Sequence, residues 1–239
     1  YTCMGDSIPI ICITGQAVSS ILHKEPLQGV DITEIVKPVT KKSFLVRETA
    51  QIPWVFRQAF QIARSGRPGP VHIDLPLDVQ RGEIEYDPEI DAPLPIYKPA
   101  PAMTQIRKAM KMLLAAERPV LMMGGGVSIA RATGPFVALA EYLQIPVIPT
   151  YMAEGGISYD HPLYGGRVGL QTNTRGGNKL FLESDFVLSI GNRFADRHTG
   201  DLAVYRGNRK FVHIDVDPTQ LGRVFPCDLG IVSDAALAI

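Results

Sequence analysis

The sequence predicts an α/β protein built on parallel β-sheets. Short, almost wholly apolar runs alternate along the 239 residues with stretches of helical periodicity, and this alternation is typical of strand–helix–strand units. Several apolar runs end directly at glycine or proline, as buried strands do where they leave a sheet. No internal repeat or low-complexity segment interrupts the pattern.

The first 85 residues are expected to form one such unit. Residues 8–14 and 71–75 are apolar runs of strand length. Between them, residues 50–64 carry apolar side chains at spacings i, i+3, i+4, i+7, i+8 and i+11, which predicts a helix with one apolar face. Residues 66–70 (Gly-Arg-Pro-Gly-Pro) end that helix. Two strands joined by a helical crossover favour parallel pairing.

A proline-rich stretch divides the chain. Residues 86–101 contain five prolines and little periodicity, so they predict an extended linker between a first domain, 1–85, and a second domain, 102–239.

The second domain is expected to be a doubly wound, Rossmann-like sheet, because strand and helix patterns alternate repeatedly along it. The predicted strands are 119–123, 145–149, 186–190 and 211–216, and the predicted helices are 103–117 and 135–143.

Composition excludes several classes of protein. The 24 basic and 24 acidic side chains give a net charge of zero, whereas nucleic-acid-binding proteins usually carry a basic excess. No apolar run approaches the roughly 18–20 residues that span a bilayer. We therefore expect neither a nucleic-acid nor a membrane partner. The chain starts at Tyr1 and stops inside a predicted helix, so we expect it to be part of a longer protein.

The cysteines and histidines predict no metal site. Cys3, Cys12 and Cys227 are too few and too scattered for a disulfide framework or a zinc site. They are expected to be buried thiols in a reducing compartment, the cytoplasm. The five histidines show no ligand spacing.

Three segments could bind a ligand. Gly124, Gly125 and Gly126 follow a predicted strand, where backbone N–H groups can hold a phosphate; a tight strand–helix turn is an equal alternative. Residues 191–200 follow another strand and contain Asn, Asp and two Arg, which suit phosphate and ribose, unless they form only a solvated loop. Residues 213–217 end in acidic side chains that can bind a ribose, but the sequence alone favours the alternative that Asp217 before Pro218 starts a turn and caps a helix.

No acid, base or nucleophile can be identified from the residues. Neither a G-x-S-x-G nor a Walker sequence occurs. The residues alone therefore predict a nucleotide-binding α/β domain joined to another α/β domain.

Several motifs occur together in a recognisable order: 13–16 (Ile-Thr-Gly-Gln), 65–71 (Ser-Gly-Arg-Pro-Gly-Pro-Val), 74–76 (Asp-Leu-Pro), 78–80 (Asp-Val-Gln), 124–126 and 191–200. The chain thereby resembles the thiamine-diphosphate-dependent acetohydroxyacid synthase family over essentially its whole length. The resemblance implies that residues 1–85 are the C-terminal part of a pyrimidine-binding domain. It implies that residues 102–239 are the central, Rossmann-like (DHS-type) domain, which in this family binds FAD.

Within the family, the segments 22–25, 168–172, 191–195, 197–200 and 217–223 look most similar to the branch that acts on glyoxylate. This implies a carboligase (lyase) of glyoxylate catabolism, which decarboxylates glyoxylate and condenses it with a second glyoxylate to tartronate semialdehyde and CO2. It further implies thiamine diphosphate with Mg2+ bound by a later domain, FAD as a structural cofactor, and a homo-oligomer, dimer or tetramer. The catalytic residues would lie outside these 239 residues, which are not expected to be active alone.

The resemblance also implies which residues contact the cofactors. Gln28 would face the thiamine-diphosphate site of a partner subunit. The FAD contacts would be Arg67, Gly124, Gly125, Gly126, Thr150, Tyr151, Met152, Leu170, Gln171, Gly191, Asn192, Arg193, Asp196, Arg197, Asp215, Val216, Gln220 and Asp234.

Two alternatives remain open. The chain could belong to the catalytic subunit of an acetolactate synthase, which condenses pyruvate. It could also be a nucleotide-binding module without catalytic activity.

Overall fold

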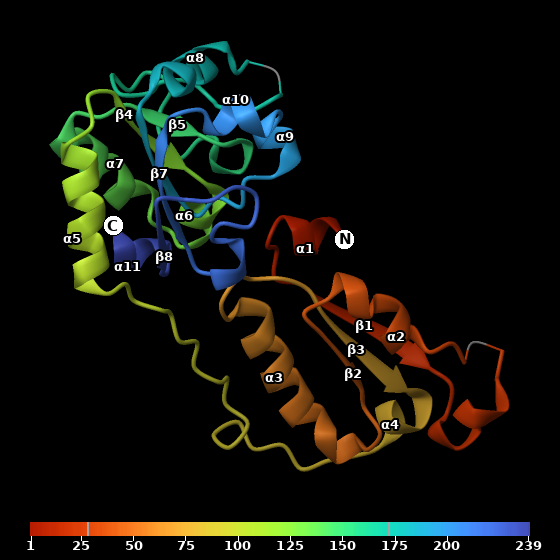
Figure 1. The fold of residues 1–239 in the computed structure, drawn as a ribbon. Coiled ribbons are helices and arrows are strands. Elements are labelled where there is room, and N and C mark those ends of the chain that lie inside the picture. Colours follow the sequence, from red (N-terminus) through yellow and green to blue (C-terminus); the bar gives the residue numbers. More distant parts are fainter. Residues whose placement is uncertain (28, 172) are drawn as a thin grey trace. The chain divides into compact units, whose positions relative to one another are not determined.

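The structure is a computed structural model that describes residues 1–27, 29–171 and 173–239. The chain divides into two compact units, Tyr1–Tyr97 and Lys98–Ile239. Each unit is built on a parallel sheet (Figure 1). The predicted α/β class with parallel sheets is confirmed.

The sheet of the first unit has the strand order β1-β3-β2, with β1 (Ile11–Gln16), β2 (Lys42–Leu45) and β3 (Val71–Pro76). The strand predicted at 8–14 begins three residues later, because Ile8 and Ile10 stay exposed outside the sheet. The sequence did not predict β2, because its first residues are polar and it is only four residues long. The short elements of this unit are α1 (Thr2–Gly5), η1 (Ser19–Lys24), α2 (Ile32–Val36), η2 (Lys37–Val39), η3 (Thr49–Gln51) and α4 (Leu77–Arg81).

The predicted helix 50–64 is α3 (Ile52–Arg64), which packs on β3. Its periodic apolar side chains explain the packing: Val55, Ala59 and Ala63 are buried against Val71 and Ile73 of the sheet. Phe60, which the periodicity placed on the same face, is instead 53% exposed.

The proline-rich stretch forms neither helix nor strand between residues 82 and 102. Its first part is tied to α3: Arg57 donates to the Ile90 carbonyl (2.6 Å) and Gln61 to the Pro95 carbonyl (3.1 Å). The boundary between the two units therefore falls inside this stretch, after Tyr97.

The sheet of the second unit has the strand order β5-β4-β6-β7-β8. Because β5 lies on one side of β4 and the later strands on the other, the chain reverses direction at the crevice between β4 and β6, as in doubly wound sheets. Strands 119–123 and 186–190 were predicted correctly, whereas β8 was not. The strands are β4 (Pro119–Met123), β5 (Val147–Pro149), β6 (Phe186–Ile190), β7 (Lys210–Asp215) and β8 (Leu229–Val232).

Helices cover both faces of this sheet (Figure 1). Leu121 and Met123 of β4 pack in the core that contains buried residues of α5, α7 and α11, whereas Val120 and Met122 pack in the core that contains those of α8 and α10. Burial on both faces explains why the strands are continuous apolar runs. The helical elements are α5 (Met103–Leu114), α6 (Gly125–Ile129), α7 (Thr133–Leu143), η4 (Tyr151–Ala153), α8 (Arg175–Glu183), α9 (Asp196–Thr199), α10 (Leu202–Arg206), η5 (Pro218–Gln220) and α11 (Ala235–Ala238).

An aromatic cluster fills the second of these cores. We define it as Phe181, Phe194, Tyr205, Phe211 and Phe225, whose neighbouring ring centroids lie 4.4–6.3 Å apart. The buried rings of His198 and His213 contact it.

The two histidines are hydrogen-bonded inside this core. His198 Nε2 lies 2.7 Å from the Tyr205 hydroxyl, and His213 Nε2 donates to the Asn192 carbonyl (2.8 Å). Burial lowers the pKa of each imidazole to about 4, so both are neutral at pH 7.

The cysteines differ from their predicted environment. All three are free thiols, but Cys12 is exposed and Cys3 and Cys227 are only partly buried. The expectation of buried thiols is therefore wrong for Cys12, which lies on the edge strand β1. Of the helices in the described ranges, none combines the length and the apolar character needed to cross a bilayer.

Truncation of Phe136 on α7 tests the core of the second unit. Phe136 is 0% exposed, and we expect Phe136→Ala to lower the free energy of unfolding by about 3–5 kcal/mol, because a large cavity remains. Tyr142→Ala on the same helix is the control: Tyr142 is 87% exposed, and its loss should cost less than about 0.5 kcal/mol. Urea denaturation measures both, and equal effects would contradict this packing.

The buried histidines predict a pH dependence of stability. Their folded-state pKa of about 4 lies below the unfolded value of 6.5, so the unfolded chain binds more protons in this range. The contribution of the two histidines to the free energy of unfolding is fully present above about pH 6.5. It falls as the pH drops towards 4, by about 1 kcal/mol per pH unit for each histidine.

The double variant His198→Gln, His213→Gln should flatten this dependence, because glutamine does not titrate. Replacement of the exposed Ser128, which does not titrate, by Ala should leave it unchanged. Denaturation curves between pH 7 and pH 4.5 measure the slopes. A double variant with the parental slope would mean that other groups cause it.

Candidate functional site

Four loops of the second unit meet at one edge of its sheet, because they follow the carboxyl ends of the parallel strands β4, β5, β6 and β7. Open α/β sheets bind ligands at this edge, beside the crevice where the strand order reverses. Most of the predicted FAD contacts lie on these loops.

The loops after β4 and β6 touch backbone to backbone. Gly124 N donates to the Ile190 carbonyl and Gly126 N to the Gly191 carbonyl, both at 2.9 Å. A Cβ atom on Gly124 would lie 2.1 Å from the Gly191 oxygen, and one on Gly126 would lie 2.7 Å from the Gly191 Cα. The glycines are therefore required by this contact, whether or not a phosphate also approaches them.

The loop after β5 lies beside this contact. Thr150 is buried and its N–H bonds the Met123 carbonyl (2.9 Å), whereas Tyr151 and Met152 are about half exposed. A Cβ on Gly125 would lie 2.9 Å from the Met152 Cβ. The structure thus brings Met152 against residues 124–126 and leaves part of its apolar surface open.

Residues 167–171 lie against the end of the loop after β6. Leu170 N donates to the Arg197 carbonyl (3.1 Å), and a Cβ on Gly200 would lie 3.2 Å from Leu170 Cδ1. Leu170 nevertheless remains 62% exposed, so it presents apolar surface beside this loop. Gln171 is partly exposed next to it.

Phe194 anchors the loop after β6. Its φ of +54° is unusual for a side chain of this size and costs of order 1–2 kcal/mol. Its ring is 3% exposed within the aromatic cluster, and its N–H donates to Asn192 Oδ1 (3.1 Å). Burial of the ring offsets the free-energy cost of this backbone conformation. Arg193 and Asp196, on either side of Phe194 in the same loop, remain exposed.

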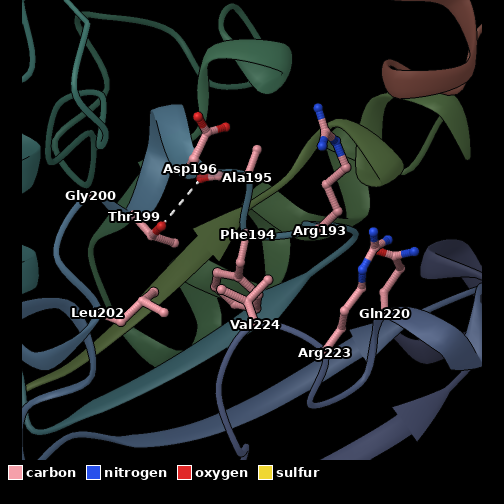
Figure 2. A pocket seen from close by; sticks show the side chains of 10 residues that line it. All are labelled: Arg193, Phe194, Ala195, Asp196, Thr199, Gly200, Leu202, Gln220, Arg223 and Val224. Carbon is pink, nitrogen blue, oxygen red and sulfur yellow. Dashed lines mark hydrogen bonds between the residues drawn. The ribbon is translucent and has the colours of Figure 1, made fainter. Parts of the chain in front are cut away.

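The pocket of Figure 2 lies between this loop and the segment after η5. Its volume is about 330 Å3. Three predicted residues line it: Arg193, Asp196 and Gln220. Phe194, Ala195, Thr199 and Gly200 also line it and belong to the predicted segment 191–200, whereas the prediction missed Leu202, Arg223 and Val224. Arg223 was detectable as a basic side chain three residues after Gln220.

Asp217 and Asp215, which both belong to the predicted ligand-binding segment 213–217, have different roles in the structure. Asp217 Oδ1 accepts the Thr219 N–H (2.9 Å) and caps η5, as the turn alternative predicted. Asp215 is buried at the end of β7, where its Oδ1 accepts the Asp217 N–H (2.9 Å). Val216 follows it and is partly exposed.

Of three other predicted contacts, one belongs to the second unit, one belongs to the first unit and one lies outside the described residues. Asp234 caps α11 and pairs with Lys98 (3.1 Å). Arg67 belongs to the first unit, where it donates to Ser7 Oγ (2.8 Å) and to the carbonyls of Met4 and Gly5. Gln28 lies outside the described residues.

Within the described ranges, no three His, Cys, Asp or Glu side chains come together as a metal site. The pocket is instead lined by arginine, amide and carboxylate side chains, together with the apolar side chains of Phe194, Leu202 and Val224.

Comparison with known proteins places this site in a family. Residues 106–239 match the family model described as the thiamine pyrophosphate enzyme, central domain. The chain is 56% identical to glyoxylate carboligase of Escherichia coli O157:H7 over 100% of the chain and 40% of that protein.

Acetolactate synthases are also similar. The chain is 42% identical to the probable acetolactate synthase large subunit of Methanocaldococcus jannaschii, over 98% of the chain and 40% of that protein. It is 41% identical to the corresponding protein of Methanococcus aeolicus, over 100% of the chain and 40% of that protein. The chain spans about two fifths of the length of these relatives. It belongs to the family of thiamine pyrophosphate enzymes, and residues 106–239 match the central domain of that family.

Proposed function

We propose that the chain is part of a thiamine-diphosphate-dependent carboligase that acts on glyoxylate. Such an enzyme decarboxylates one glyoxylate and joins the remaining carbon unit to a second glyoxylate, which yields tartronate semialdehyde and CO2. The observation that carries this proposal is the 56% identity to a glyoxylate carboligase, against 42% to an acetolactate synthase, over nearly the same residues.

In this proposal, residues 1–85 are the C-terminal part of the pyrimidine-binding domain. The three parallel strands and α3 of the first unit agree with such a part of an α/β domain. The complete enzyme would be a cytoplasmic homo-oligomer, a dimer or tetramer, with Mg2+ and most of the thiamine-diphosphate site in regions outside these residues. Thiamine diphosphate supplies the cleavage and formation of the carbon–carbon bonds.

The residues of the second unit fit FAD in three respects. The crevice loops offer exposed apolar surface on Met152 and Leu170. The pocket offers positive charge on Arg193 and Arg223, which suits a diphosphate. Asp196 on the pocket wall and Asp215 at the strand end can accept hydrogen bonds from hydroxyl groups.

The proposed FAD contacts in this unit lie on these loops and strand ends and at the start of α11: Gly124, Gly125, Gly126, Thr150, Tyr151, Met152, Leu170, Gln171, Gly191, Asn192, Arg193, Asp196, Arg197, Asp215, Val216, Gln220 and Asp234. Arg67 would contribute from the first unit and Gln28 would face thiamine diphosphate. Because the carboligation has no net redox change, FAD would be structural. The chain's own side chains would then bind and orient it through Arg193 and the apolar loop residues, while Phe194 keeps the loop in place.

An acetolactate synthase is the second candidate, because relatives of that name match nearly the whole chain at 41–42% identity. A nucleotide-binding module without catalysis would require the same pocket but no thiamine diphosphate.

The substrate is tested with the full-length enzyme. We expect thiamine-diphosphate-dependent CO2 release, with kcat/KM for glyoxylate exceeding that for pyruvate by roughly 10- to 200-fold, the range by which a site discriminates one methyl or methylene group. Reactions without thiamine diphosphate are the control. A preference for pyruvate would establish the acetolactate synthase candidate, and no cofactor-dependent CO2 release would favour the non-catalytic module.

The flavin site is tested at the loop contact. Gly124→Ala places a methyl group 2.1 Å from the Gly191 oxygen, so the loops after β4 and β6 must separate. Overpacking of this kind costs about 1–3 kcal/mol, and we expect the FAD content per subunit of the purified full-length protein to fall about tenfold.

Ser128→Ala, at an exposed position of the adjacent helix α6, should retain the parental flavin content. Flavin absorbance and the melting temperature are measured together. If Gly124→Ala kept both values, the loop contact would not control flavin binding.

A further inference from the structure

An arginine is buried beside the loop after β5. Arg167 is only 6% exposed, and arginine side chains are rarely buried unless a partner compensates their charge. It is not among the residues that line the pocket of Figure 2, and the proposed function gives it no role. The contacts of its guanidinium group show what this buried charge does.

The backbone around Arg167 is held on two sides. Val168 N donates to the Pro149 carbonyl at the end of β5 (3.1 Å). On the other side, a Cβ atom on Gly177 of α8 would lie 2.3 Å from the Arg167 oxygen. Because a strand and a helix both contact this segment, the Arg167 side chain begins at a fixed position.

The Arg167 guanidinium pairs with Glu154, the first residue after η4 and 13 residues earlier in the chain. Glu154 Oε2 accepts from Arg167 Nη1, and Glu154 Oε1 accepts from the Tyr159 hydroxyl (2.8 Å). The hydrogen bonds from Tyr159 and Arg167 hold the pKa of Glu154 below its ordinary value, so the pair is ionised at pH 7. The Tyr159 ring packs edge-on against Tyr164, with centroids 5.2 Å apart. The end of η4 is therefore tied to Arg167.

Tyr151, the first residue of η4, contacts the same guanidinium. Arg167 Cζ lies 5.4 Å from the centroid of the Tyr151 ring, within the range of a cation–π interaction. Tyr151 is nevertheless 56% exposed. One face of the ring is thus held by a buried charge, while much of the residue remains open to solvent.

An exposed aromatic ring of fixed orientation favours a planar ring as its ligand. Aromatic rings attract one another in offset-stacked or edge-to-face arrangements. Met152 and Leu170, which are 49% and 62% exposed, offer further apolar surface on the loops of the same sheet edge. A ring that is already in place before the ligand binds lowers the entropic cost of binding.

We propose that Arg167 is a positioning residue, which together with Glu154 holds the Tyr151 ring as a platform on which a planar heteroaromatic ring of the cofactor stacks. This inference rests on the proposed function, which assigns FAD and includes Tyr151 among its contacts. FAD contains two such rings, the isoalloxazine and the adenine. Riboflavin carries only the first and ADP only the second, so these two probes distinguish the rings.

The test uses the full-length protein after removal of bound flavin. FAD, riboflavin and ADP are each titrated by calorimetry against the parental protein and against Arg167→Gln. We expect Arg167→Gln to raise the Kd for FAD about tenfold, within the range of a partly desolvated cation–π contact. The Kd should rise by a similar factor for riboflavin or for ADP, but not for both, because the platform contacts one ring.

A double-mutant cycle distinguishes positioning from a general structural role. Tyr151→Leu removes the aromatic platform and should itself raise the Kd for FAD about tenfold. In the Tyr151→Leu background, Arg167→Gln should change the Kd by less than about twofold, because Arg167 acts through the ring. A merely structural arginine would weaken binding by the same factor in both backgrounds.

Conservative variants and controls complete the cycle. Tyr151→Phe keeps the ring and should bind FAD as the parental protein does, whereas Arg167→Lys keeps the charge but not the planar guanidinium and should have an intermediate Kd. Arg175→Gln, at the exposed start of α8, and Tyr142→Leu, on the exposed face of α7, are the matched controls and should leave the Kd unchanged. Circular dichroism establishes that each variant is folded. If Arg167→Gln does not fold, Glu154→Gln replaces it in the same cycle, with the same expected coupling to Tyr151.

The inference is refuted if Arg167→Gln binds FAD within about twofold of the parental Kd, if riboflavin and ADP lose affinity equally, or if the two substitutions of the cycle act additively. In each of these outcomes the parental protein binds FAD, so the proposed cofactor stands. If the parental protein binds none of the three probes, the proposed flavin site is wrong and the platform is overturned with it.

Discussion

The backbone contact between residues 124–126 and Gly191 is the constraint on which the site of the second unit depends. It joins the ends of β4 and β6, the two strands between which the sheet reverses its direction. No side chain fits at Gly124 or Gly126 without displacing the facing backbone. Because these backbone hydrogen bonds hold the ends of the two strands together, the loops that follow β4 and β6 begin at fixed positions relative to each other.

The loop after β6 shows how a buried core determines an exposed surface. Phe194 adopts a backbone conformation that is unfavourable in isolation, and the aromatic cluster and the Asn192 side chain stabilise it. His198 and His213 contribute as neutral imidazoles, which burial favours over the charged form. A loop that is held by the buried core in this way can keep charged side chains in place before a ligand binds, and this lowers the entropic cost of binding.

The zero net charge of the chain conceals this local arrangement. Basic and acidic side chains balance over the whole sequence, yet the pocket has arginines on one wall and Asp196 on the other. The relatives named glyoxylate carboligase and acetolactate synthase are similar to the chain over nearly its whole length, which includes the residues of this pocket.

The sequence by itself determined the elements whose physical signal is local. Strands 119–123 and 186–190 were predictable because burial on both faces requires an uninterrupted apolar run, and α3 because one face of a helix meets the sheet. The strands β2 and β8 were not, since both are four residues long and interrupted by polar residues or glycine. The loops of the candidate site were predictable only as positions that follow strands.

Tertiary structure decided what those loops do. Glycines 124 and 126 fit a phosphate loop and a close backbone contact equally well in the sequence, and only the position of Gly191 shows that the contact requires them. Asp217 proved to be a cap, and Arg223 joined the pocket although it lies 30 residues from Arg193. Such relations depend on which strand ends are neighbours in the sheet, and hydrophobic periodicity along a single chain does not contain that information.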